Sequence, residues 1–444
     1  MRTRMMRAKV VVIALLMILS AHRAAFSDVF FTAHDSGKNA STIGNVSIKS
    51  GAFVVNKKST EAGARVFGYN SGSRLLLTIP DPTGDDTAFI YKSANVSEVL
   101  SQTKWPHVRD IFDASYLRGY LYVACRGSSN IVKIDTNFNT RKEIDWVYPQ
   151  RGAVPHLPEG YVAKAVSVAI LGDEIYGLFT ISNSQGEYRD SILVKLADDI
   201  TTLRTLSYAA VVPDATAVFV LGNDLYVVGR GKNIEKDADP RQSLIQKVNT
   251  GTMSVTNLVS AYDLESSGGY IEALALTEAG DAFVVTHKPS ADKTEVKYYL
   301  LKGLNPTSAQ KLMTLSGDFS SLRYDNVSKL FWVSNATGKT DKGAQLYAFD
   351  SAGKRAASLN TSELGGTPNS LTIAKGSDGS SVDSNASTGS GGCSTGATLP
   401  FIMLLPLGYC LRKRGKKVNF GTLPPLPWDH SPDKSLKHAG KGDE

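Results

Sequence analysis

Cysteine is scarce in this chain, with three in 444 residues. Cys393 and Cys410 lie in or beside an apolar run near the C-terminus, so Cys125 is alone in the rest of the sequence. One cysteine cannot build a disulfide framework, and a hydrophobic core must therefore stabilise the body of the protein. The roughly 350 residues between the two ends are enough to form such a core.

Catalytic and cofactor motifs are also scarce. No His/Cys cluster has zinc-ligand spacing, residues 35–41 lack the full ligand series of a calcium loop, and Gly-x-Ser-x-Gly does not occur. The sequence therefore predicts no cofactor and favours a non-enzymatic binding or structural role. An enzyme with a divalent metal in a central channel is the alternative, and its candidate carboxylates are Asp110, Asp113, Asp214 and Glu272.

The body of the chain carries no net positive charge, although the formal net charge of the whole chain is +7. Residues 1–27 carry five basic and no acidic residues, and residues 412–444 carry eight basic and four acidic residues. The charge left to residues 28–411 is therefore −2. Because a nucleic-acid surface needs a concentrated basic face, we expect no nucleic-acid partner.

The N-terminus has the pattern of a secretory signal peptide. A basic start is followed by the apolar run 10–19, and 25–27 offers small residues for cleavage. Ten apolar residues are too few to span a bilayer, which takes about 20. We predict cleavage after Ser27, with a retained N-terminal anchor as the alternative.

The C-terminus changes composition at Lys375. Residues 375–392 are rich in Gly and Ser and predict a flexible spacer, because they offer little apolar surface to bury. An apolar run from Ala397 to Leu411 and a basic cluster at 412–417 follow, in the order of a stop-transfer segment. The run is short and contains Pro400 and Pro406, which disfavours a permanent membrane helix.

The Gly-Gly-Cys-Ser-Thr-Gly sequence that starts at Gly391 resembles the opening of bacterial CTERM-type sorting signals, and the Synergistes-type version most of all. The resemblance covers about residues 391–414 and implies processing or anchoring at Gly392 and Cys393 by export and sorting machinery. It places the protein at a bacterial cell envelope or surface. Such tails usually stop after the basic cluster, whereas this chain continues to Glu444. A plain single-pass helix with a short cytoplasmic tail is the alternative.

A short pattern recurs through the body: a polar turn followed by an apolar or aromatic strand. Its equivalent positions are separated by 46, 46, 54, 50, 57 and 48 residues; they are Phe30, Leu76, Tyr122, Tyr176, Tyr226, Phe283 and Phe331. A stretch of small apolar residues precedes each copy and an alternating strand follows it. Four short strands per unit of this length are typical of a β-propeller blade.

Counting the copies predicts an all-β, seven-bladed propeller of no identified family. Residues 29–33, 43–49 and 52–57 supply three strands of one blade, and 370–374 supplies its inner strand, which closes the ring. Six blades plus an N-terminal hairpin is the rival count, and a pair of β-sandwiches is a further alternative. The predicted organisation is a signal peptide (1–27), the propeller (28–374), the spacer (375–392), a sorting or transmembrane segment (393–414) and a disordered tail (415–444).

Polar residues follow five of the repeated strands. In a closed ring the ends of these strands meet at one face, where propellers commonly bind ligands. The predicted ring could hold an anionic ligand, such as a glycan or a peptide carboxylate, through His34, Arg126, Arg230, His287 and Asn335. Solvated turn residues are the alternative interpretation of these positions.

Overall fold

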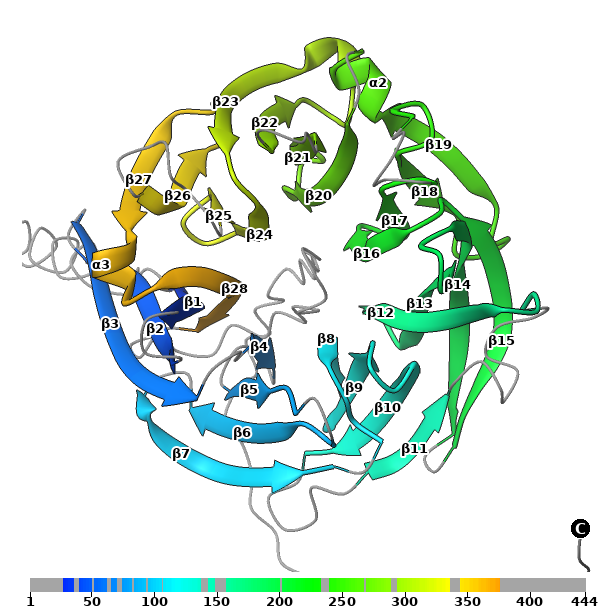
Figure 1. Ribbon diagram of the computed structural model, residues 1–444, viewed down its shortest axis with the longest axis horizontal. Coiled ribbons are helices and arrows are strands. Elements are labelled where there is room, and N and C mark those ends of the chain that lie inside the picture. Colours follow the sequence, from blue (N-terminus) through cyan, green and yellow to red (C-terminus); the bar gives the residue numbers. More distant parts are fainter. Residues whose placement is uncertain are drawn as a thin grey trace, which may run out of the picture. The chain divides into compact units, whose positions relative to one another are not determined.

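The computed structural model describes residues 27–375, apart from 36–39, 50–51, 62–64, 70–73, 82–83, 93–94, 106, 137–142, 148–156, 200–201, 233–238, 267–268, 289–293 and 336–343. Seven four-stranded antiparallel sheets in these residues form the blades of a β-propeller (Figure 1). The predicted fold class is confirmed. The six-bladed count and the pair of β-sandwiches are wrong.

Three blades come from the first half of the chain, together with its last strand. Blade 1 contains β28 (Thr367–Lys375), β1 (Ser27–Asp35), β2 (Ala40–Lys49) and β3 (Ala52–Glu61). Blade 2 contains β4 (Arg65–Tyr69), β5 (Arg74–Ile79), β6 (Thr87–Lys92) and β7 (Asn95–Lys104). Blade 3 contains β8 (Ile111–Leu117), β9 (Tyr120–Cys125), β10 (Asn130–Asp135) and β11 (Glu143–Val147).

Two further blades follow in order. Blade 4 contains β12 (Tyr161–Leu171), β13 (Glu174–Asn183), β14 (Tyr188–Asp199) and β15 (Thr202–Val211). Blade 5 contains β16 (Ala215–Leu221), β17 (Asp224–Gly229), β18 (Leu244–Val248) and β19 (Val255–Ser260), and the short helix α2 (Ala261–Leu264) follows it.

The last two blades complete the ring. Blade 6 contains β20 (Tyr270–Leu276), β21 (Ala282–Lys288), β22 (Glu295–Leu301) and β23 (Gln310–Ser316), with η2 (Pro306–Ser308) before its last strand. Blade 7 contains β24 (Phe319–Asp325), β25 (Leu330–Asn335), β26 (Ala344–Asp350) and β27 (Arg355–Asn360), and α3 (Thr361–Leu364) leads from it to β28.

The two ends of the propeller meet in blade 1, as the sequence predicts. β28 pairs antiparallel with β1, and Thr372 lies opposite Phe30. β28 also holds the neighbouring blade, because the Thr372 hydroxyl accepts a hydrogen bond of 2.9 Å from the backbone N–H of Gly68 on β4. A shared blade leaves no open edge in the ring.

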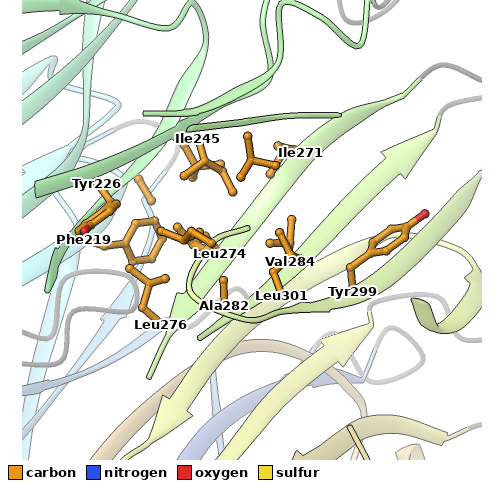
Figure 2. Packing of buried hydrophobic residues seen from close by; sticks show 14 of the residues in the cluster. Phe219, Tyr226, Ile245, Ile271, Leu274, Leu276, Ala282, Val284, Tyr299 and Leu301 are labelled. Carbon is orange, nitrogen blue, oxygen red and sulfur yellow. The ribbon is translucent and has the colours of Figure 1, made fainter. Parts of the chain in front are cut away.

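The repeated aromatic positions form the core between blades. Each lies on the second strand of its blade and is buried, from Phe30 on β1 to Phe331 on β25. Figure 2 shows one such layer, in which Phe219 and Tyr226 of blade 5 pack with Leu274 and Leu276 of blade 6. Cys125 is buried in the same way in blade 3, where it behaves as a small apolar residue.

In blades 3, 4 and 5 the repeated position is a tyrosine, and a lysine–carboxylate ion pair lies beside it. The tyrosine on the second strand lies opposite a lysine on the third, and a carboxylate contacts that lysine. The three sets are Tyr122, Lys133 and Asp198; Tyr176, Lys195 and Glu174; and Tyr226, Lys247 and Asp224. The side chain of Lys133 is 1% exposed, so its ammonium is the most deeply buried of the three.

A substitution at Gly177 on β13 tests the packing between blades 3 and 4. A Cβ at this position would lie 2.1 Å from Cδ1 of Ile131 on β10. We expect Gly177→Ala to lower the free energy of unfolding by about 1–3 kcal/mol through overpacking. Ile131→Val removes the clashing methyl group, so the double variant should recover part of that loss in urea unfolding. Strictly additive losses would contradict the contact.

Within the residues that the structure describes, no helix is long and apolar enough to cross a membrane. The predicted signal peptide up to residue 26, the spacer beyond Lys375, the sorting segment with Gly392 and Cys393, and the tail all lie outside the described residues.

Candidate functional site

Six of the seven inner strands contain a one-residue β-bulge near the same end. On β8, for example, Ile111 lies opposite Cys125 and Asp113 opposite Ala124, so Phe112 is the extra residue. The six extra residues are Phe112, Val166, Thr216, Glu272, Ser320 and Asn369. Bulges of this kind redirect side chains and are common beside functional sites.

All six bulge residues line one cavity, of about 220 Å³, in the central channel. The inner strand of blade 2 has regular pairing, and it contributes Arg65 to the lining instead. All seven blades therefore contribute to the lining of a common space. Arg230 and Arg323 also line this cavity.

A recess of about 400 Å³ adjoins the channel cavity where blades 3, 4 and 5 meet. The two spaces share Phe112, Val166, Thr216 and Arg230 in their linings. The other polar groups of the recess are Asp110, Arg126, Ser129, Lys164, Thr180, Ser182, Tyr188 and Asp214.

Asp110 organises the blade 3 side of the recess. Its carboxylate oxygens accept hydrogen bonds from Arg65 and from Arg126, both at 2.8 Å. The two guanidinium groups lie 5.0 and 4.7 Å from the centre of the Phe112 ring. Asp110 has a φ of 50°, in the left-handed region, and its carbonyl accepts from the backbone N–H of Arg126 at 3.0 Å. This local turn fixes the carboxylate between the two arginines.

The same arrangement recurs in blade 5. Asp214 has a φ of 46°, and its carbonyl accepts from the backbone N–H of Arg230 at 3.1 Å. Nε of Arg230 lies 2.9 Å from Oδ2 of Asp214 and its Nη1 lies 3.9 Å from Oε2 of Glu272. Burial lowers the pKa of Arg230, but the two carboxylates outweigh that effect and raise it overall.

The lining of the two spaces is more positive than the body of the chain as a whole. The two linings together contain the cations Arg65, Arg126, Lys164, Arg230 and Arg323 and the carboxylates Asp110, Asp214 and Glu272. The cavity walls are thus positive, whereas residues 28–411 as a whole are negative. Lys164 makes no ion pair with a carboxylate among the described residues, so its charge is available at the recess.

The predicted metal-binding carboxylates do not converge. Asp110 contacts two arginines, and Asp214 and Glu272 flank Arg230. Asp113 lies elsewhere and accepts hydrogen bonds from the Ser167 hydroxyl at 2.6 Å and from the Val168 N–H at 3.1 Å. In the described part of the chain, no group of three or more His, Cys, Asp or Glu residues could hold a metal ion.

Asp113 should make stability depend on pH. Burial raises the pKa of this carboxyl to about 6, although hydrogen bonds and the charge of Arg323 oppose the rise. Because the folded pKa lies above the unfolded value, charging Asp113 penalises the fold above pH 6, and protonation relieves the penalty on acidification. We expect Asp113→Asn to abolish about 1–2 kcal/mol of the stability gained between pH 7.5 and pH 5. Urea unfolding at both pH values measures this, and an unchanged gain would contradict it.

Two of the five residues predicted to bind ligand, Arg126 and Arg230, line the recess. His287 lies behind Glu272, with Nδ1 3.6 Å from Oε2 and 2.9 Å from the Tyr270 hydroxyl, and lines neither cavity. His34 pairs with Thr367 on β28 and lines neither cavity. Asn335 is fully buried and also lines neither cavity.

Of the six bulge residues, the sequence predicted a functional role only for Glu272 and missed the other five. Phe112 and Thr216 look like ordinary strand residues, and nothing in a single sequence distinguishes the extra residue of a bulge from its neighbours. Lys164 and Tyr188 belong to the long strands β12 and β14 of blade 4, which form one wall of the recess.

The molecule is thus a seven-bladed β-propeller with a cationic cavity at the channel end where its second strands terminate. No protein-family model matches the chain, and no curated protein matches its sequence. Solved structures resemble it in fold. A periplasmic gluconolactonase from Pseudomonas aeruginosa is 12% identical, with a TM-score of 0.55 over 79% of this chain and 99% of that one. A protein from Lactobacillus plantarum is 11% identical, with a TM-score of 0.55 over 78% and 99% of the two chains.

Proposed function

We propose that this propeller is an exported, envelope-anchored binding module that takes an anionic ligand in the channel cavity and the adjoining recess. The supporting observation is the lining of these two spaces, in which five cations face three carboxylates, whereas residues 28–411 as a whole are close to neutral. Arginine suits such a ligand because its guanidinium binds carboxylate and phosphate groups through two parallel hydrogen bonds.

The double variant Arg126→Gln/Arg230→Lys tests the site. It removes one cation and replaces the other by a point charge that still faces Asp214 and Glu272. We expect binding of acidic ligands to fall about 100-fold or more, since one charge-assisted contact is lost and lysine cannot form the two parallel hydrogen bonds of the other. Titration calorimetry with carboxylated sugars and glutamate peptides measures this. Arg241→Gln, whose side chain is 66% exposed and outside both cavities, is the matched control. Unchanged affinity in the double variant would rule the site out.

The export and anchoring parts of the proposal rest on the sequence of the two ends. Mass spectrometry of the protein from its native envelope should show a mature N-terminus at Asp28. It should also show a chain that ends or is modified near Cys393. An intact N-terminus in the cytoplasmic fraction would contradict export, and it would leave the binding site untouched.

The alternative function is a propeller enzyme that acts on an extracellular sugar or other small molecule around a divalent ion. The likeness to a gluconolactonase motivates it, and at 12% identity that likeness concerns the fold. Metal analysis of the purified protein together with a lactone hydrolysis assay separates the two functions. A stoichiometric divalent ion and a turnover that Glu272→Gln abolishes would replace the binding role with catalysis.

A further inference from the structure

We infer that the ligand is an acidic oligosaccharide of at least two sugar units, which spans the channel cavity and the recess as two subsites. This inference rests on the proposed function and adds to it the chemical class and minimum length of the ligand. Four observations support it: the hydroxyl groups of the lining, the division of its cations, the broken strand edges and the free charge of Lys164.

Hydroxyl side chains dominate the uncharged polar lining of both spaces. The recess has Ser129, Thr180, Ser182, Tyr188 and Thr216, and the channel cavity has Ser320, Ser321 and Ser370. In the channel cavity the Ser320 and Ser370 hydroxyls already donate to the carbonyls of Pro368 and Val66, so they can accept hydrogen bonds from a ligand. In the recess the Thr180 hydroxyl has no hydrogen-bond partner among the described residues, so it can both donate and accept, as sugar hydroxyls do. Arginine beside such groups adds recognition of a carboxylate, so the lining suits a uronic acid better than a neutral sugar.

The cations are divided between the two spaces. Arg65 and Arg323 line only the channel cavity, Arg126 and Lys164 line only the recess, and Arg230 lines both. A single sugar acid in either space leaves the unshared cations of the other without a ligand charge. A chain with one carboxylate per unit can place one charge in each space, with Arg230 at the junction.

A peptide fits this site less well. Peptides that bind to sheets usually add as a strand and use a regular row of unpaired backbone N–H and C=O groups. Six of the seven inner strands are interrupted by a bulge at this end of the channel, which breaks the regular row. Recognition here therefore depends on side chains, as carbohydrate binding does.

Lys164 distinguishes the two subsites. It is exposed, lines only the recess and forms no ion pair with a described carboxylate, so its loss should leave the fold intact. Lys354 provides a matched control, because it is also exposed but lies in the turn between β26 and β27, at the opposite ends of the strands. Lys164→Ala should weaken only those ligands that reach the recess.

The experiment is titration calorimetry of the purified protein with galacturonic, glucuronic and mannuronic acids as monomers, dimers and trimers. At least one acid series should bind, and its dimer should bind about tenfold or more tighter than its monomer, which corresponds to one added charge-assisted contact. Lys164→Ala should remove that gain in the dimer. Lys354→Ala should leave that gain unchanged.

Other outcomes separate this inference from the proposed function. Equal affinity for monomer and dimer would overturn the two-subsite ligand, while monomer binding that Arg126→Gln/Arg230→Lys abolishes would still support the anion site. A triglutamate peptide that binds tighter than every acidic sugar would overturn the carbohydrate class. If neither sugars nor peptides bind, the proposed function falls together with the inference.

Discussion

Asp198→Ala is expected to lower the free energy of unfolding by about 3–5 kcal/mol, because it removes the carboxylate of a buried ion pair. Nζ of Lys133 lies 2.5 Å from Oδ1 of Asp198, and the side chains are 1% and 19% exposed. The Tyr122 hydroxyl also donates a hydrogen bond to Asp198. The substitution leaves an ammonium in the core beside the Tyr120 ring, 4.1 Å from its centre, without this counter-charge.

The double variant Lys133→Met/Asp198→Ala is the matched control for this pair. It removes the buried ammonium together with its carboxylate, and methionine keeps most of the apolar stem of Lys133 packed. Replacing buried ions by apolar residues of similar volume is often close to neutral, so we expect a loss of no more than about 1 kcal/mol. Urea unfolding of both variants measures the difference. Equal losses would show that Asp198 contributes through packing and not through charge.

The repeat in this chain made the fold predictable. A blade buries its aromatic second strand whatever its loops contain, so Tyr122 and Tyr176 stay recognisable while the spacing between copies varies. The closure by residues 370–374 was predictable for a related reason. The N-terminal segment supplies only three strands, and an open blade would expose an edge. Both features follow from burial and backbone pairing, which leave a periodic pattern in the sequence.

The site was predictable only in part, because it depends on local geometry that leaves no such pattern. Arg126 and Arg230 follow second strands and were found at the channel face, as expected of strand ends. Asn335 has the same place in its blade but is buried, because its strand extends one residue further than β17 does. The role of Phe112 depends on a bulge, and whether a strand has an extra residue is decided by pairing with its neighbour.

The role of the carboxylates Asp110 and Asp214 was also predictable only in part. Asp110 and Asp214 were recognised as acidic residues at strand starts, which is compatible with a metal site. Their partners, Arg126 and Arg230, come 16 residues later in both blades, and this equal spacing was a signal for the paired arrangement. The positive φ at both aspartates, which turns each carboxylate toward its arginine, could not be predicted from the sequence.

Arg230→Gln is expected to lower the free energy of unfolding by about 3–5 kcal/mol at pH 8, because it leaves two mostly buried carboxylates without their shared cation. The side chains of Asp214 and Glu272 are 4% and 19% exposed. Burial already raises the pKa of Asp214 to about 6, and the charge of Arg230 opposes that rise. Without Arg230 the pKa of Asp214 should rise further above its unfolded value. The pKa of Glu272, which Arg230 and His287 now hold below its ordinary value, should rise as well.

The penalty in Arg230→Gln should therefore be largest above these raised pKa values and shrink as the pH falls to 5, because protonation neutralises the carboxyls in the folded state. Urea unfolding of Arg230→Gln and of the parent protein at pH 8 and pH 5 tests the sign. Arg230→Gln/Glu272→Gln removes one of the two stranded charges, so it should be more stable at pH 8 than Arg230→Gln alone. A loss that stays the same at both pH values, and that Glu272→Gln does not reduce, would show that Arg230 acts through packing. The three groups would then not form the charged junction between the channel cavity and the recess.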